Sequence, residues 1–107
     1  MISSDSMRGY NDAIILAVLA RGDSYGFEIS KAITAGTNDA YTLRETTLYS
    51  TLTRLVKSGA LSAYAGELSY GRPRTYYHLT AIGRTILAAK KQEWHQVQGV
   101  VTHFLEE

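Results

Sequence analysis

The 107-residue sequence predicts a mainly α-helical fold with a small β-hairpin, arranged as a winged helix-turn-helix followed by a long C-terminal helix. Three observations lead to this prediction. A capped amphipathic helix occupies residues 42–59, and the apolar period changes from about 3.6 residues to about 2 directly after it. Two short strands then flank a basic Gly-Arg-Pro-Arg tip at residues 71–74. We expect a winged helix-turn-helix over residues 7–80 and a dimerisation helix over residues 81–105 that packs with the first helix.

The first two helices are predicted to support the third. The first, from about Arg8 to Arg21, is apolar nearly all round, which is typical of a helix at the centre of a core. Ser24 is a candidate N-cap for the second helix, from about Tyr25 to Ala35, because its hydroxyl can accept from a free backbone amide. Gly36 follows, and glycine commonly ends helices. We expect Tyr25 to be buried with Ile29 in this helix.

The third helix begins and ends at recognisable signals. Thr42 and Glu45 predict a capping box, in which each side chain bonds the backbone amide of the other residue. Gly59 tolerates the left-handed conformation that ends helices. Between these signals, apolar residues at helical spacing predict one buried face, formed by Leu48, Leu52, Leu55 and Val56.

The other face of this helix is built from hydroxyl and cationic side chains with one acid in the first turn. These are Arg44, Thr47, Ser50, Thr51, Arg54 and Lys57, with Tyr49 beside them. A solvated face usually mixes Glu with Lys, so this composition favours a polar, anionic partner. We interpret the stretch as a recognition helix for duplex DNA. The predicted contacts on it are Arg44, Thr46, Thr47, Tyr49, Ser50, Arg54 and Lys57.

Position along the helix separates the roles of these contacts. Arg44 and Thr47 lie near the N-terminus, which is best placed for base edges. Arg54 and Lys57 are expected to meet phosphates, which position the protein without reading sequence. Tyr49 is either a half-buried ring or a phenol that bonds a phosphate.

A β-hairpin follows Gly59. Leu61–Ala65 and Thr75–Leu79 alternate as strands do, and residues 66–74 connect them. The connection could be a plain exposed turn, but a turn that needs glycine and proline has no need of Arg72 and Arg74. We therefore predict a DNA-contacting wing, whose arginines reach phosphates or a narrow minor groove.

The last helix, from Ala81 to Leu105 with Thr80 as its N-cap, is longer than a small core can cover. A helix of about 25 residues spans roughly 37 Å, so its far half should project beyond the domain. We infer that this half pairs with a second copy of the chain. The predicted dimer interface consists of Ile86, Lys90, Trp94, Val97, Val101 and Phe104.

The net charge of +1 hides an asymmetry along the chain. From Arg44 to Lys91, eight basic and two acidic residues give +6, and the remaining residues carry −5. Nucleic acid is the commonest partner for such a basic segment in a near-neutral protein.

Several classes of protein are excluded by what the sequence lacks. There is no cysteine for a disulfide or a thiolate metal site. His95 and His103 lie about 12 Å apart along a helix, too far to share one metal ion. No nucleophile motif, acid pair or phosphate-binding glycine loop is present, so we expect neither an enzyme nor a cofactor. The longest apolar run, Ala13–Ala20, is too short to cross a membrane, and no signal peptide is recognisable, so we expect a cytoplasmic protein.

Motifs spread over roughly Met7 to Phe104 resemble the PadR family of transcriptional regulators. They are Tyr25-Gly26, Thr47-Leu48-Tyr49, Leu52 with Arg54-Leu55 and Gly59, and Gly71-Arg72-Pro73-Arg74 leading into Tyr76-Tyr77-His78-Leu79-Thr80-Ala81-Ile82-Gly83. The single C-terminal helix resembles the short PadR subfamily. The resemblance implies a homodimeric repressor that binds a palindromic operator and is released by a small molecule.

In multidrug-sensing members of that subfamily, a tryptophan in the last helix stacks on planar aromatic ligands at the dimer interface. Trp94 lies at the matching place, and the resemblance implies further lining by Ile14, Leu16, Val97 and Gln98. Lys90, Lys91 and His95 surround Trp94, so a neutral or anionic aromatic ligand is at least as well suited as a cationic drug.

Two alternatives remain open at this point. The chain could be a winged-helix module that docks a protein and never meets DNA, because fold alone does not determine function. It could also be a DNA-binding repressor without a ligand, in which Trp94 only holds the dimer together.

Overall fold

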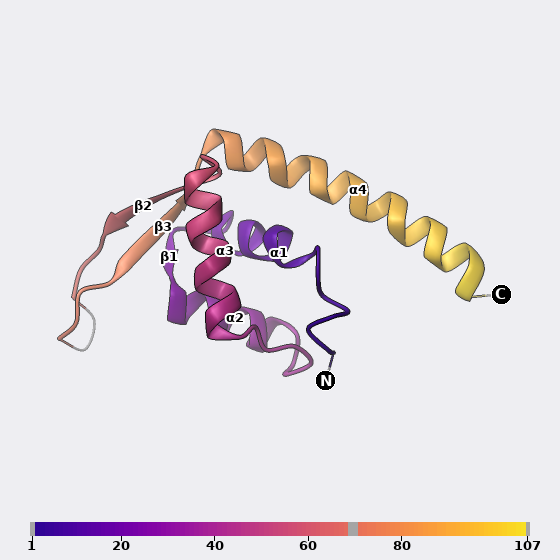
Figure 1. Cartoon of the computed structure of the whole chain (residues 1–107), viewed down its shortest axis with the longest axis horizontal. Helices are drawn as coiled ribbons and strands as arrows, with labels where there is room; N and C mark the ends of the chain where they lie inside the picture. The colour runs from indigo at the N-terminus through magenta and orange to yellow at the C-terminus, as the bar shows by residue number, and fades with distance from the viewer. Residues whose placement is uncertain (1, 69–70, 107) are drawn as a thin grey trace.

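The computed structural model describes residues 2–68 and 71–106 and contains four helices and a small antiparallel sheet (Figure 1). The elements in chain order are α1 (Asn11–Leu19), β1 (Ser24–Tyr25), α2 (Gly26–Gly36), α3 (Glu45–Lys57), β2 (Leu61–Ala65), β3 (Thr75–Leu79) and α4 (Ala81–Leu105). Helices α1, α2 and α3 form one group, from which the β2–β3 hairpin and the far end of α4 extend in opposite directions. The predicted fold class is confirmed.

The sheet has the strand order β1-β3-β2, with all neighbours antiparallel. Strands β2 and β3 have the predicted bounds, and Leu61 pairs with Leu79 and Ala65 with Thr75. The short strand β1 was not predicted, because two residues have no readable period. Ser24 is therefore not an N-cap: its hydroxyl donates to the Glu28 carboxylate over 2.8 Å, and α2 begins only at Gly26.

Two further helix starts differ from the prediction. Helix α1 begins at Asn11 rather than near Arg8, because Gly9 has a φ of +91°, which a right-handed helix cannot contain. Helix α3 begins at Glu45 without a side-chain cap, so the predicted capping box of Thr42 is wrong. Tyr41 and Leu43 are buried, and Thr42 between them is exposed. Because side chains alternate in this way along an extended chain, these residues are extended rather than helical.

The helix signals at Gly59 and Thr80 are confirmed. Gly59 adopts a φ of +85° just after α3. The Thr80 hydroxyl accepts from the Gly83 amide over 3.0 Å and donates to the Gly59 carbonyl over 2.6 Å, so it joins the start of α4 to the end of α3. A β-carbon at Gly83 would overlap the Ala60 carbonyl oxygen, and only glycine allows this close approach.

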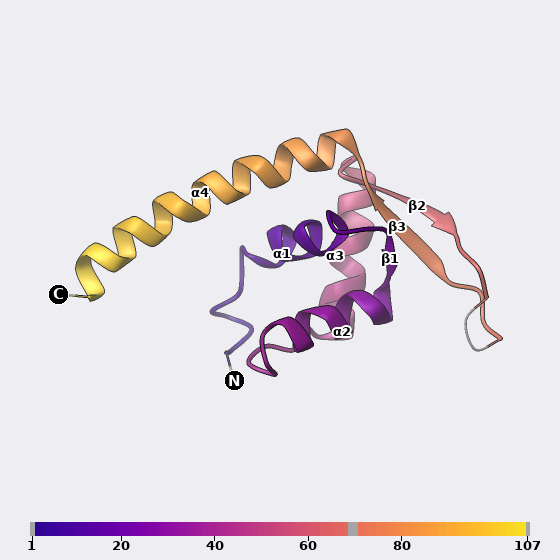
Figure 2. The same ribbon diagram turned by 180° about the vertical axis from the view of Figure 1, so that it is seen from behind.

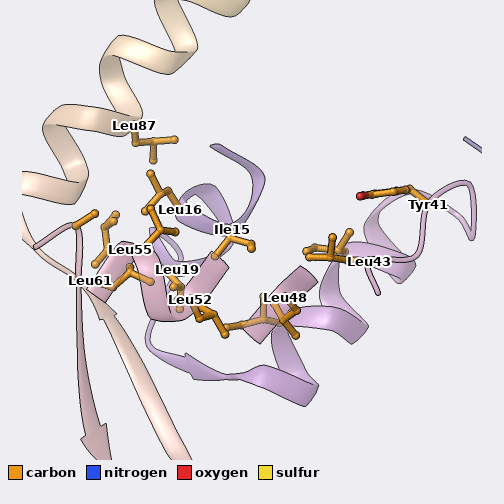
Figure 3. Packing of buried hydrophobic residues seen from close by; sticks show 14 residues of the cluster. Ile15, Leu16, Leu19, Tyr41, Leu43, Leu48, Leu52, Leu55, Leu61 and Leu87 are labelled. Carbon is orange, nitrogen blue, oxygen red and sulfur yellow. The ribbon is translucent and has the colours of Figure 1, made fainter. Parts of the chain in front are cut away.

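The core surrounds α1, whose Ile15, Leu16 and Leu19 are almost fully buried. Figure 3 shows Leu16 between the α3 side chains and Leu87, which extends toward it from α4. The apolar character of α1 all round its axis is explained by this central position. The first half of α4 thus packs on the domain through α1.

The second half of α4 leaves the domain. Figures 1 and 2, which view the molecule from opposite sides, both show it apart from the other elements, and the chain extends over 54 × 30 × 21 Å. The buried line of Gly83 and Leu87 continues at helical spacing through Trp94, Val97 and Val101, of which Trp94 and Val101 are each 46% exposed. No helix in the described part of the chain is long and apolar enough to cross a membrane.

Candidate nucleic-acid interface

Helix α3 has two sharply different faces. Its inner face, Leu48, Thr51, Leu52 and Leu55, is buried. Its outer face is an exposed stripe formed by Thr46, Tyr49, Ser50, Thr53 and Lys57, and the one exposed acid of the helix, Glu45, lies in its first turn at the edge of this stripe. We call these five residues the outer stripe. Such a face offers hydroxyl and ammonium donors along a straight line.

The structure changes the interpretation of two threonines. Thr51 was placed on the outer face but is only 5% exposed, because it lies one residue from Leu52 on the side that packs inward. Thr53 was left out of the predicted contacts, although it lies in the outer stripe between Ser50 and Lys57. The spacing of three and four residues that links it to these neighbours was the signal that could have found it.

Tyr49 fixes the crossing of α2 and α3. Its ring lies against the backbone of Gly26, where a β-carbon would overlap the phenol. The side chain is nevertheless 42% exposed, so it is not a core residue. Behind it, burial raises the pKa of Tyr77, and the nearby Tyr49 adds to the rise. Tyr49 therefore braces α2 and still presents a surface to a partner.

Arg44, at the N-terminal end of α3, is exposed beside a shallow hollow of about 580 Å³. The N-terminal segment forms the other wall of the hollow, held by a hydrogen bond of 2.8 Å from the Ile2 amide to the Ala40 carbonyl. Thr47 also lines the hollow and is half-buried.

In the described residues, no group of three histidine or acidic side chains is placed to hold a metal ion.

Arg54 is engaged within the protein. Its two terminal nitrogens donate to the two oxygens of Asp12 in α1, over 2.9 and 2.7 Å. Hydrogen bonding to Arg54 holds the pKa of Asp12 below its usual value, and nearby Lys90 of α4 contributes as well. Arg54 thus joins α3 to α1, while its side chain stays 59% exposed and keeps N–H donors that Asp12 does not use.

The two wing arginines lie in different surroundings. Arg72 is exposed, as the sequence suggested. Arg74 is half-buried, with its guanidinium carbon 5.0 Å from the centre of the Tyr25 ring. Tyr70, which also belongs to the predicted tip, lies outside the described residues.

The root of the wing is a row of tyrosines across the sheet. The ring of Tyr76 in β3 lies 5.3 Å from that of Tyr25 in β1 and 5.8 Å from that of Tyr64 in β2. The prediction that Tyr25 joins Ile29 inside α2 is therefore wrong, because Tyr25 forms strand β1 instead.

A carboxylate also ties the two long strands to the body of the domain. Asp23, just before β1, accepts from the Tyr64 hydroxyl over 2.7 Å and lies 2.8 Å from the Nδ1 atom of His78. These contacts, first with Tyr64 and then with His78, lower the pKa of Asp23. The wing is thus held at its root by both aromatic and polar contacts.

The predicted ligand and dimer residues lie on a separate surface. The Trp94 ring meets Tyr10 edge to face, with ring centres 5.4 Å apart, and the sequence had not singled out Tyr10. Ile14 and Val97 are half-buried and Gln98 is exposed, so all three retain accessible surface. Leu16 is fully buried within the core and offers no surface to a ligand, so we remove it from the predicted site.

The six residues of the predicted dimer interface all lie on α4. Ile86, Lys90 and Val97 are half-buried, whereas Trp94, Val101 and Phe104 are exposed. Apolar exposure thus increases toward the C-terminus, where Phe104 and Leu105 are 70% and 77% exposed.

Comparison with known proteins identifies similar sequences. Residues 15–89 match the model of the transcriptional regulator PadR-like family. An uncharacterised protein from Lysinibacillus sphaericus is 39% identical over 106 residues, which cover 99% of this chain and 97% of that protein.

Solved structures show the same architecture. A transcriptional regulator from Clostridium thermocellum is 45% identical with a TM-score of 0.89, and the match covers 95% of this chain and 99% of that one. A PadR family transcription regulator from Clostridium difficile is 36% identical with a TM-score of 0.78, covering 91% and 99% of the two chains. Bacillus subtilis PadR, solved in complex with operator DNA, shares the fold at 20% identity and a TM-score of 0.68, over 78% of this chain and 46% of that one.

Proposed function

Because this chain belongs to the PadR-like family of transcriptional regulators, we propose that it is a repressor that binds a palindromic operator in double-stranded DNA as a homodimer. The outer stripe of α3 is the observation that carries this proposal. It is exposed and rich in donors, the one exposed acid of α3 lies in the first turn, and the opposite face of the same helix is buried. A helix with one such face fits the major groove, which is about 12 Å wide.

The residues divide into those that contact base edges and those that contact the DNA backbone. Arg44, Thr46 and Thr47 lie at the start of α3 and meet base edges, since the N-terminal residues of a recognition helix reach deepest into the groove. The other residues of this surface meet phosphates and sugars, and these contacts fix register without reading sequence. They are Tyr49, Ser50, Thr53, Arg54 and Lys57 on α3, and exposed Arg72 and half-buried Arg74 on the wing.

The far half of α4 supplies the dimer contact. Trp94, Val101 and Phe104 would otherwise present apolar side chains to water. Pairing of this helix with its copy brings two α3 helices into one symmetric assembly. Half-sites about one DNA turn apart, roughly 34 Å, then make a palindrome the natural operator.

The proposal also includes a planar aromatic effector. Trp94 is 46% exposed and meets Tyr10 edge to face, so its ring retains an open surface, and the proposed lining residues Ile14, Val97 and Gln98 retain accessible surface as well. A molecule held between the two Trp94 rings of a dimer would change the spacing of the α3 helices. The effector would lower the affinity for DNA only to the extent that it binds the altered spacing more tightly than the spacing that fits DNA.

Titration of tryptophan fluorescence with a panel of planar aromatic compounds tests the effector. The chain has one tryptophan, so the signal reports Trp94 alone. Saturable quenching that accompanies loss of DNA affinity supports the effector. Absence of quenching across the panel leaves a repressor in which Trp94 only holds the dimer together.

Selection from a library of random duplexes tests the operator. We expect enrichment of sequences with two inverted half-sites about one helical turn apart. The solved complex of Bacillus subtilis PadR with operator DNA, on the same fold, supports DNA binding itself. Recovery of unenriched DNA would contradict the proposal and favour a winged-helix module that docks another protein.

A further inference from the structure

Arg74 is held by an aromatic ring rather than by an acceptor. Its guanidinium carbon lies 5.0 Å from the centre of the Tyr25 ring, within the range of a cation–π contact. Its Nε atom is shielded from solvent and has no hydrogen-bond partner in residues 2–68 and 71–106. Within the same described residues its four terminal N–H donors form no hydrogen bond, so they can bind an anionic partner.

The Tyr25 ring is itself held in place by the neighbouring ring of Tyr76. Tyr25 pairs with Tyr76 in the β1–β3 register, and the two ring centres lie 5.3 Å apart. Tyr76 is backed by Tyr64 and by Gly66, where a β-carbon would overlap the Tyr76 ring. Arg74 therefore lies on a platform that is continuous with the sheet.

We propose that Tyr25 is a positioning residue for the wing, whose ring holds the Arg74 guanidinium ready to meet a phosphate of the operator. The inference rests on the proposed DNA-binding function. A free arginine loses rotamer freedom when it binds, whereas one already held on a ring loses less. Arginine suits this arrangement because its planar cation can stack and still donate through its edge. Arg72, which is exposed, provides the contrasting free arginine.

A double-mutant cycle tests the coupling, with fluorescence anisotropy of a labelled duplex as the measurement. We expect Tyr25→Leu to weaken binding about fivefold, and Tyr25→Phe, which keeps the ring, to bind like the wild type. Arg74→Ala should make the negative slope of log K on log salt shallower by about 0.9 for each subunit bound. In the Arg74→Ala background, Tyr25→Leu should cause no further loss.

Two results would overturn the proposal. An equal loss from Tyr25→Leu in both backgrounds would mean that the ring acts only through the stability of the sheet. A loss from Tyr25→Phe equal to that from Tyr25→Leu would mean that the hydroxyl itself contacts DNA. Tyr64→Leu measures the loss that comes from a weaker sheet alone, because Tyr64 supports Tyr76 and bonds Asp23 but does not touch Arg74, and this loss should be smaller than that from Tyr25→Leu.

A further variant keeps the proposal testable if Tyr25→Leu does not fold. Arg74→Lys retains the charge but not the planar group, and we expect it to bind more weakly than the wild type. Wild-type affinity in Arg74→Lys would contradict the role of stacking. Failure of the wild-type protein to bind any duplex would instead contradict the proposed function.

Discussion

Both terminal nitrogens of the Arg54 guanidinium donate to the Asp12 carboxylate, joining the last turn of α3 to the first turn of α1. The Asp12 side chain is 24% exposed and that of Arg54 is 59% exposed, so water weakens the pair without removing it. The contact links the proposed recognition helix to the core helix on which α4 also packs. It is therefore a structural restraint on α3 within the protomer.

Asp12→Asn should reduce the free energy of unfolding by about 1 kcal/mol at neutral pH, because it breaks a bidentate, charge-assisted contact. The pKa of Asp12 is depressed in the folded state, so its stabilisation is present above the ordinary value of 3.8 and is lost as pH falls through the lowered value. Denaturant unfolding of both proteins from neutral to acidic pH measures this, and the difference between them should vanish in acid.

Asp5→Asn is the control for that measurement. Asp5 also bonds an arginine, Arg8, but the two side chains are 85% and 82% exposed. This substitution should leave stability unchanged at every pH. An effect of Asp12→Asn no larger than that of Asp5→Asn would show that the Arg54 contact contributes nothing.

Gly26→Ala should destabilise the fold by about 1–3 kcal/mol, since the new methyl group would overlap the Tyr49 ring. Gly36→Ala is the matched control in the same helix, because no atom lies within 4 Å of the added methyl group. Thermal unfolding of both variants measures the difference. Equal stability of the two would contradict the close contact of α2 and α3.

Val101→Glu should convert the proposed homodimer to a monomer, because it places a charge on the apolar line that continues from Leu87. Gln92→Glu introduces the same charge on the other side of α4 and should leave association intact. Sedimentation velocity distinguishes the two species. A dimeric Val101→Glu protein would move the interface away from this face.

Arg44→Ala should relax operator preference while leaving binding to random DNA nearly unchanged, because Arg44 is exposed at the start of α3. Lys57→Ala should weaken binding to both DNAs equally, since it lies at the far end of the helix among the phosphate contacts. Paired titrations with operator and random duplex measure this. If Arg44→Ala weakens both DNAs to the same extent, Arg44 is a phosphate contact.

The elements that the sequence predicted well have local signals. The alternation in Leu61–Ala65 and Thr75–Leu79 determined both strands, and the Thr80 cap determined the start of α4. These patterns depend only on neighbouring residues. The fold class followed from their order along the chain.

The features that were missed depend on residues far apart in sequence. The stacking of Arg74 on Tyr25 exists because β1 pairs with β3, and a two-residue strand has no period to read. The contact of Asp12 with Arg54 needs the packing of α1 against α3. The Thr42 cap failed because burial of its two neighbours outweighs one exposed hydrogen bond.

The most direct test of DNA binding is a fluorescence-anisotropy titration of a labelled random-sequence duplex at two salt concentrations. We expect binding in the micromolar range that weakens steeply with salt, because each phosphate contact contributes about −0.9 to the slope of log K on log salt. No binding at low salt would contradict the account, and the outer stripe of α3 would then be examined as a surface for a protein partner.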